Sequence, residues 1–442
     1  MSTSSRTIAV EVLHRVFFDG AFSHIALSHA LDDSKLSPRD QGLTTELVYG
    51  TLARKRTIDA VLSRFVNRSI DTLDRPVLLA LRLAAYQLIY LDRVPAHAAV
   101  DESVEIAKEH CGRGAAGFTN GVLRSMLRKK RRWNPWDDVD AQKDPVRHLG
   151  LRYSLPDWIS AMLIEQHGTD NARRVARALG ARPPLYFRAL QAVPEPLPDG
   201  LSEVDAVDGA LRAEQMSAAI RQHVDDGRLV VQDLGSQLVG HFAEPSEATE
   251  ILDACAGLGG KTLHLAALAG DNAQITAVDP MGSKLDRLSA TIADTALEDR
   301  ITTLTSPLAD LSKENSAFDL VLVDAPCSGI GVIRRHPETR WRRGPKDVEN
   351  RARLQAKLLR QAAHHVSPGG LLVYAVCSFS DAEGRQQIEA FLEEQDHFQR
   401  EPLSEDDEID WSRYTDEAGD LRLNPADHDT DAFYAARLRR RE

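Results

Sequence analysis

The chain has 442 residues, of which 43% are hydrophobic and 27% charged, and its formal net charge is −12. Its length predicts two or three domains rather than one core. No apolar run approaches the roughly 20 residues that a membrane span needs, and the first residues lack the apolar core of a secretory signal, so we expect a cytoplasmic protein without membrane contact. The four cysteines lie far apart without a C-x-x-C pair, so neither a metal site nor a disulfide framework is expected.

The acidic average hides two basic clusters. Residues 124–132, "RSMLRKKRR", hold six cations in nine positions, and residues 334–343, "RRHPETRWRR", hold five arginines, while acidic residues gather at 405–410. Such a run is usually a solvated surface. The net charge alone argues against a polyanionic partner, but these two basic clusters remain candidate sites for binding one.

Three kinds of sequence pattern follow one another along the chain. Apolar residues at three-to-four spacing predict helices from about 6 to 130, with breaks at Pro76, Pro95 and Gly112. Residues 131–230 are mixed and partly proline-rich. From 230 onward, short apolar strands such as "QITAVD" and "FDLVLVDA" alternate with amphipathic helices. We expect an all-α bundle at 1–133, a small α+β connecting domain and linker at 134–228, and a Rossmann-like domain with a doubly wound, mainly parallel sheet at 229–442.

A glycine-rich turn joins a predicted strand to a predicted helix in "ILDACAGLGGKT", residues 251–262. Such a turn lets backbone N–H groups approach a ligand, and Asp279 ends the next strand, where a carboxylate can bind ribose hydroxyls. The segment also resembles a phosphate-binding P-loop, but that pattern requires glycine where Cys255 stands. A nucleotide-shaped methyl donor, S-adenosylmethionine, fits this turn together with the thiols considered next.

Cys327 and Cys377 each follow a predicted strand, at the sheet edge where ligands bind. Carbon 5 of cytosine is a poor nucleophile, but a thiolate that adds at carbon 6 activates it, and a second group can help to expel that thiol. The two thiols therefore favour methylation of a pyrimidine carbon. Asp324 is placed to hydrogen-bond the ring, and Lys261 to lower the thiol pKa or to hold a phosphate.

The segments "ILDACAGLGGKT", "AVDPMGSKLDRL", "FDLVLVDAPCSGIGVIRRHPETRW" and "LVYAVCS" resemble the successive motifs of the RNA 5-methylcytosine methyltransferases. The N-terminal "ELVYGTLARKRTIDAVLSRF" resembles the NusB-like RNA-binding domain that precedes the enzyme in one branch of this family. The resemblance implies S-adenosylmethionine as cofactor and a cytosine of 16S ribosomal RNA as substrate, free or within a small-subunit assembly intermediate. We expect a monomer.

The resemblance also implies residue roles. Cys377 is the attacking thiol and Cys327 assists product release, with Asp324 and Lys261 as the other catalytic residues. Asp279 and Asp324 line the cofactor pocket together with the loop residues Cys255, Ala256, Gly257, Leu258, Gly259, Gly260 and Lys261. The basic segment 334–343 follows Cys327 and is expected to hold the RNA backbone.

The chain departs from the family pattern at a few positions. Ala256–Gly260 replaces the usual Ala-Ala-Pro-Gly-Gly, and Val376 and Gly384 replace Thr and Asn. An aspartate on the adenine side has no clear counterpart, and Asp310 is the nearest carboxylate. Three other functions stay open: methylation of transfer RNA or another RNA, an RNA-binding scaffold whose methyltransferase half has decayed, and an NTPase.

Overall fold

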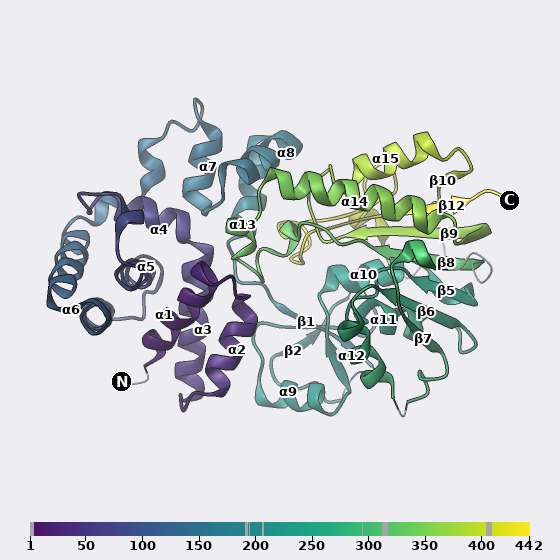
Figure 1. Cartoon of the computed structure of the whole chain (residues 1–442), viewed down its shortest axis with the longest axis horizontal. Helices are drawn as coiled ribbons and strands as arrows, with labels where there is room; N and C mark the ends of the chain where they lie inside the picture. The colour runs from purple at the N-terminus through teal and green to yellow at the C-terminus, as the bar shows by residue number, and fades with distance from the viewer. Residues whose placement is uncertain are drawn as a thin grey trace. The chain divides into compact units, whose positions relative to one another are not determined.

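The computed structural model describes residues 4–190, 193, 195–205, 207–293, 295–311, 317–403 and 409–442, so most of the acidic run at 405–410 lies outside the described residues. The chain forms two compact units (Figure 1). The helical unit comprises Met1–Ala181 and Ile333–Arg342, and the α/β unit comprises Arg182–Val332 and Arg343–Glu442. The boundary after Ala181 lies inside the segment 134–228, so a separate connecting domain stays a prediction. None of the described helices is long and apolar enough to cross a bilayer.

The helical unit contains the following helices: α1 (Ser5–Phe18), α2 (Ser23–Asp32), α3 (Pro38–Ala53), α4 (Lys55–Leu62), α5 (Arg75–Tyr90), α6 (Ala96–Arg128), α7 (Pro145–Tyr153), α8 (Asp157–Ala178) and α13 (Thr339–Arg342). The predicted breaks occur as expected. Pro76 lies in the first turn of α5, Pro95 precedes α6, and Gly112 has a φ of 82° that kinks α6. Glycine is favoured there because a side chain disfavours this left-handed conformation.

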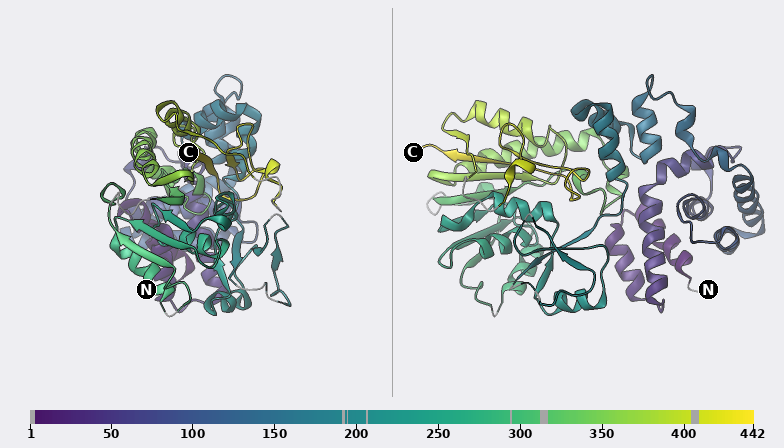
Figure 2. Two further views of the ribbon diagram at one scale, coloured as in Figure 1. Left: turned by 90° about the vertical axis from the view of Figure 1, so that its right-hand side faces the viewer. Right: turned by 180° about the vertical axis from the view of Figure 1, so that it is seen from behind.

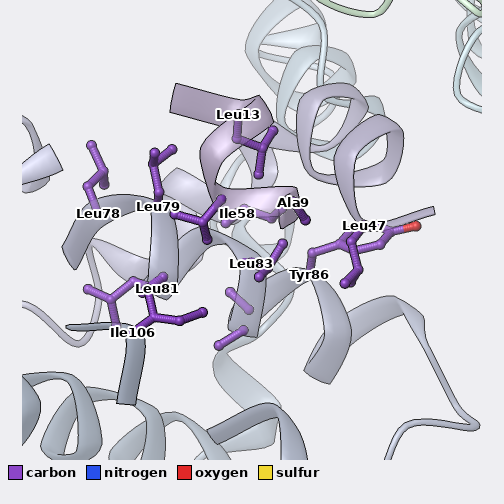
Figure 3. Packing of buried hydrophobic residues seen from close by; sticks show 14 of the residues in the cluster. Ala9, Leu13, Leu47, Ile58, Leu78, Leu79, Leu81, Leu83, Tyr86 and Ile106 are labelled. Carbon is purple, nitrogen blue, oxygen red and sulfur yellow. The ribbon is translucent and has the colours of Figure 1, made fainter. Parts of the chain in front are cut away.

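An apolar cluster packs helices α1 to α6 of the helical unit together (Figure 3). Leu79 and Leu83 of α5 are fully buried in it, as are Leu13 of α1, Leu47 of α3 and Ile58 of α4. These residues stand at the three-to-four spacing that places apolar side chains on one face of each helix. The all-α prediction for this part of the chain is therefore confirmed.

Residues Ile333–Arg342 belong to the helical unit, although the chain on both sides of them lies in the α/β unit. The guanidinium of Arg340 is buried and donates to the carbonyl oxygens of Leu179 at 3.2 Å and Ile333 at 2.9 Å. Arg342 donates to the carbonyl oxygen of Val16 at 2.6 Å. The expectation that segment 334–343 binds RNA phosphates is therefore wrong for Arg340, because its buried guanidinium serves backbone carbonyls inside the unit. For the partly exposed Arg342 it stays a prediction.

The α/β unit has two sheets (Figures 1 and 2). A small antiparallel sheet has the order β2-β3-β1-β4, and an eight-stranded sheet has the order β10-β12-β9-β8-β5-β6-β7 with β11 paired to β12. Strands β7, β6, β5, β8 and β9 run parallel to one another, and β12 is antiparallel to β9.

The strands are β1 (Leu185–Ala189), β2 (Leu201–Glu203), β3 (Ala210–Ala213), β4 (Leu229–Val231), β5 (Glu250–Asp253), β6 (Gln274–Asp279), β7 (Ile301–Thr305), β8 (Phe318–Asp324), β9 (Val366–Val376), β10 (Phe398–Arg400), β11 (Leu421–Leu423) and β12 (Phe433–Arg440). The helices are α9 (Ala218–Asp225), α10 (Leu234–Phe242), α11 (Gly260–Leu268), α12 (Gly282–Ile292), α14 (Pro345–Ala363) and α15 (Arg385–Glu394).

Helices cover both faces of the large sheet (Figure 2). Leu322 of β8 points to the face packed by α10, α11 and α12, whereas its neighbours Val321 and Val323 point to the face packed by α14 and α15. Both faces are apolar because successive side chains of a strand alternate between them. The predicted doubly wound, mainly parallel sheet is therefore confirmed, and its central strands are buried on both sides.

Candidate active site

The predicted site residues lie at the carboxyl edge of the parallel strands. The strand order reverses at β5 and β8, since the chain continues from β5 to β6 and β7 on one side and from β8 to β9 on the other. In such sheets a crevice forms at this switch point. Strands β8 and β9 pair with Asp324 opposite Ala375, so the loops that carry Cys327 and Cys377 start side by side.

The glycine-rich loop is shaped by two left-handed glycines and tied to strand β6. Gly257 and Gly259 have φ angles of 58° and 83°. A Cβ atom on Gly259 would lie 2.4 Å from Leu288 Cδ1, so only glycine fits beside α12. The backbone N–H of Gly257 donates to Asp279 Oδ2 at 3.1 Å, and that of Met281 donates to Oδ1 at 2.8 Å. The loop and Asp279 are therefore one connected structure, as expected of a nucleotide site.

Three exposed apolar side chains stand at the ends of neighbouring strands. Leu258 follows β5 and is 55% exposed, Met281 follows β6 and is 53% exposed, and Leu304 lies near the end of β7. Isolated exposed leucines need no explanation, but apolar side chains beside a nucleotide-type loop offer contacts for a flat ring. No local sequence pattern indicated Met281 or Leu304.

The structure brings the four predicted catalytic residues together. Cys327 Sγ and Cys377 Sγ lie 3.2 Å apart, and both residues are partly buried. Lys261 Nζ of α11 donates to Asp324 Oδ2 at 2.7 Å. The same ammonium lies 5.4 Å from the ring centroid of Phe433 in β12, a residue that the sequence did not indicate. Loops and strands from four parts of the α/β unit thus converge on one pair of thiols.

The charge states at the site follow from these contacts. The hydrogen bond with Cys327, together with burial, raises the pKa of the Cys377 thiol well above its ordinary value, although Lys261 acts in the opposite direction. Burial alone would lower the pKa of Lys261, but the Asp324 carboxylate outweighs it and the pKa is raised. At neutral pH the site therefore holds a protonated Cys377 beside the ammonium of Lys261.

Asp253 ends β5 beneath the glycine-rich loop. Its side chain is fully buried and accepts a hydrogen bond from Thr262 Oγ1 at 2.7 Å. Burial raises the pKa of this carboxyl to about 6. The folded chain therefore binds the proton more tightly than the unfolded chain does, and the free energy of unfolding falls as the pH rises from about 4 through 6.

We expect Asp253→Asn to remove this pH dependence. The amide keeps an acceptor for Thr262 but carries no charge, so its stability relative to the wild type should rise by about 2 kcal/mol between pH 4 and pH 8. Urea unfolding at several pH values measures the difference. Parallel curves for the two proteins would contradict a raised pKa at Asp253.

Sequence reasoning missed the role of Glu383, which belongs to the loop of Cys377 and joins it to the loop of Cys327. Its buried carboxylate accepts hydrogen bonds from the hydroxyls of Ser328 and Ser378, the residues that follow the two cysteines. The serine after each cysteine was the available signal. Arg343, the last arginine of the basic segment, belongs to the α/β unit, and its Nε donates to the carbonyl oxygen of Ser328 at 3.2 Å.

The remaining cysteines and Asp310 take no part in the contact between Cys327 and Cys377. Cys111 packs against the core of the helical unit, and Cys255 packs against the sheet core, where burial raises the pKa of its thiol. Asp310 is exposed and ends a short 3-10 helix, Leu308–Asp310. Among the described residues, no hydrogen bond or ion pair links Asp310 to the glycine-rich loop, so the adenine-side carboxylate stays without an assignment.

Residues 241–439 match the model of the family "16S rRNA methyltransferase RsmB/F", and residues 3–128 match the NusB family. The chain thus has the organisation of an rRNA methyltransferase, with a NusB domain ahead of a Rossmann-like methyltransferase domain.

The chain is 33% identical over 456 aligned residues to the probable ribosomal RNA small subunit methyltransferase B of Bacillus subtilis, covering 99% of each chain. It is 31% identical to ribosomal RNA small subunit methyltransferase B of Klebsiella pneumoniae, covering 88% of this chain and 89% of that protein. The chain therefore belongs to the ribosomal RNA small subunit methyltransferase B family.

Two solved structures share the fold. The crystal structure of PH0851 superposes with a TM-score of 0.76 at 22% identity and covers 99% of both chains. The crystal structure of NSun6 from Pyrococcus horikoshii with SFG has a TM-score of 0.57 at 18% identity, covering 65% of this chain and 98% of that one. Both likenesses support the confirmed fold class.

Proposed function

We propose that the protein transfers a methyl group from S-adenosylmethionine to carbon 5 of a cytosine in 16S ribosomal RNA. The observation that carries this proposal is the thiol pair, 3.2 Å apart, beside the Lys261–Asp324 ion pair at the sheet edge. Methylation of an exocyclic amine needs no thiol, and phosphoryl transfer needs charge and positioning rather than a soft nucleophile.

The glycine-rich loop and Asp279 fit the proposed cofactor. Asp279 offers carboxylate oxygens for ribose hydroxyls, and Leu258 and Met281 offer apolar contacts for an adenine ring. NSun6, which shares the fold, was crystallised with SFG, an analogue of this cofactor. When bound, S-adenosylmethionine supplies an electrophilic methyl group on a sulfonium.

The residues of the chain supply the rest of the chemistry. Cys377 loses its proton and its sulfur bonds to carbon 6 of the cytosine, which makes carbon 5 nucleophilic. After carbon 5 gains the methyl group, a base removes its proton and the bond between sulfur and carbon 6 breaks, returning the electron pair to sulfur. We assign to Asp324 the hydrogen bonds from the amino group of the ring and from N3 once N3 is protonated, and to Cys327 the assistance of release. The Lys261–Asp324 contact and the 3.2 Å between the two sulfurs support these roles. The base must leave its stack to reach the thiol.

The raised pKa of Cys377 predicts a pH dependence of the single-turnover rate. Only the thiolate attacks, and below the pKa its fraction grows about tenfold for each pH unit. We therefore expect the rate of methyl transfer to rise from pH 6 to pH 9 without levelling off. Rapid-quench measurements with enzyme in excess test this, and a plateau already at pH 7 would contradict it.

The basic cluster at 124–132 is the RNA-binding surface that we propose for the helical unit. Arg124, Arg128, Lys129, Lys130 and Arg131 are all exposed around the end of α6. Cations on such a surface replace counterions on a nucleic-acid backbone, so their affinity depends steeply on salt.

Replacing Lys129, Lys130 and Arg131 by alanine should weaken RNA binding and flatten its salt dependence. Each lost phosphate contact reduces the slope of log affinity against log salt by about 0.7 to 0.9. Filter binding between 50 and 200 mM salt, roughly the range over which such contacts are felt, measures the slope. Lys108→Ala is the matched control, because Lys108 is exposed but paired with Glu105 at 2.6 Å. An unchanged slope in the triple variant would contradict the assignment.

One assay separates the proposed activity from its alternatives. The protein is incubated with labelled S-adenosylmethionine and unmodified 16S RNA, and 5-methylcytosine is mapped; transfer RNA and small-subunit particles serve as parallel substrates. Label at a 16S cytosine supports the proposal, and label in transfer RNA alone would replace it. If no substrate is methylated, RNA binding in a filter assay would indicate a decayed scaffold, and phosphate release in a parallel reaction with ATP would indicate an NTPase.

A further inference from the structure

We propose that Glu383 is a positioning residue that fixes the two thiols against each other. Glu383 belongs to the loop that follows β9, and its fully buried side chain reaches the loop that follows β8. Its carboxylate bonds to the residues next to the cysteines, and its effect on the two sulfurs passes through those residues. The catalytic consequence of this inference rests on the proposed function, whereas the geometric part does not.

The carboxylate of Glu383 joins both thiol loops. Oε1 accepts the backbone N–H of Ser328 at 2.7 Å, and Oε2 accepts the Ser328 hydroxyl at 2.5 Å and the Ser378 hydroxyl at 2.7 Å. Ser328 and Ser378 directly follow Cys327 and Cys377 in the chain. A shift of either serine therefore moves the neighbouring thiol, and one side chain controls both positions.

The carboxylate is also saturated. Gln355 Nε2 is the fourth donor to this carboxylate and lies 3.2 Å from Oε1. It also donates to the carbonyl oxygen of Pro326 at 3.2 Å. A carboxylate has about four lone-pair sites, and these four donors occupy them. Replacing Glu383 by glutamine keeps the size of the side chain but turns one acceptor into a donor that faces other donors.

The position of Glu383 itself is fixed by the sheet. Tyr374 of β9 donates its hydroxyl to the carbonyl oxygen of Glu383 at 2.6 Å. The two loops touch again at Gly331, whose N–H donates to the carbonyl oxygen of Cys377 at 3.1 Å; a Cβ there would lie 2.7 Å from the carbonyl carbon of Cys377. Glu383 is therefore anchored to β9, and the close contact at Gly331 restricts movement of the two thiol loops relative to each other.

Thiol–disulfide exchange measures the relative position of the thiols without any methyl transfer. In a glutathione buffer, Cys327 and Cys377 together give up two protons and two electrons to one glutathione disulfide, which leaves as two glutathione thiols. The equilibrium constant reports the effective concentration of one thiol at the other. Alkylation of the remaining free thiols and peptide mass spectrometry quantify the Cys327–Cys377 disulfide.

We expect Glu383→Gln to lower this constant about tenfold, equal to a shift of about 30 mV in reduction potential. Asp319→Asn is the matched control. Asp319 lies at the other end of β8, and its carboxylate likewise accepts backbone N–H groups and a hydroxyl, from Thr249 and Glu250. That variant should keep the wild-type constant although its stability changes. A folded Glu383→Gln protein with the wild-type constant would overturn the inference.

Two further variants keep the test decisive if Glu383→Gln does not fold. Ser378→Ala and Ser328→Ala each remove one hydroxyl donor and leave the carboxylate in place. Each should lower the exchange constant by a smaller factor, about twofold to threefold, and constants equal to the wild type in both would also overturn the inference. In the methyl-transfer assay, Glu383→Gln should lower kcat and leave the KM for S-adenosylmethionine unchanged. If the wild type transfers no methyl group, the proposed function fails while the exchange result still decides the positioning role.

Discussion

Cys377→Ser is expected to abolish methyl transfer, with a loss of at least about 10³-fold in single-turnover rate. A hydroxyl fills nearly the same space as the thiol but is a far weaker nucleophile at neutral pH unless a neighbouring base activates it. The adjacent Lys261–Asp324 pair holds its charges in an ion pair, so it cannot replace the missing thiolate. Labelled S-adenosylmethionine and unmodified 16S RNA provide the measurement.

Cys111→Ser is the matched control for that experiment. Cys111 also carries a free thiol, but it packs against the core of the helical unit. The control should retain the wild-type rate. Full transfer by Cys377→Ser would refute the assignment of the nucleophile. Binding of unmodified RNA to both variants, measured without cofactor, shows whether a lost rate reflects lost chemistry or lost RNA affinity.

Cys327→Ala is expected to accumulate a covalent complex between protein and RNA. Its sulfur lies 3.2 Å from that of Cys377, close enough to act on the bond between Cys377 and carbon 6. Without this group, attack and methyl transfer proceed but release slows by roughly 10²-fold or more. The complex should survive denaturing electrophoresis as a slowly migrating band that contains both labelled RNA and protein.

The double variant Cys327→Ala with Cys377→Ser tests the origin of that band. It should form no complex, because the sulfur that bonds to the base is missing. A single Cys327→Ala variant that turns over normally without any band would contradict the release role. A band that persists in the double variant would assign the covalent bond to another residue.

The sequence predicts the sheet and the thiol pair because both depend on local patterns. Cys327 and Cys377 each follow an apolar strand, and adjacent parallel strands place their carboxyl ends at the same edge. The glycine-rich loop is likewise visible in the sequence, since its glycines adopt conformations that other residues avoid. The proposed catalytic group is therefore predictable from the order of strands and loops along the chain.

Other features depend on tertiary contacts that no local pattern reveals. Glu383 stands 55 residues after Ser328 in the chain, and only the fold brings its carboxylate against the loop that carries Ser328 and Cys327. Arg340 reads as part of a basic, solvent-facing run, yet it is buried and serves carbonyl oxygens. A run of charged residues predicts exposed side chains. The prediction fails for Arg340 because backbone carbonyl oxygens satisfy its buried guanidinium.

The segment Ile333–Arg342 makes the helical unit discontinuous, and this has a consequence for biosynthesis. Within that segment, Glu338 accepts hydrogen bonds from the backbone N–H and the hydroxyl of Ser23, and Trp341 donates to the carbonyl oxygen of Leu52. In a chain that folds from its N-terminus as it leaves the ribosome, Ser23 and Leu52 lack these partners until most of the α/β unit has been translated. The first-made helices thus reach their final state only after the Cys327 loop has emerged, so the N-terminal half is completed late rather than early.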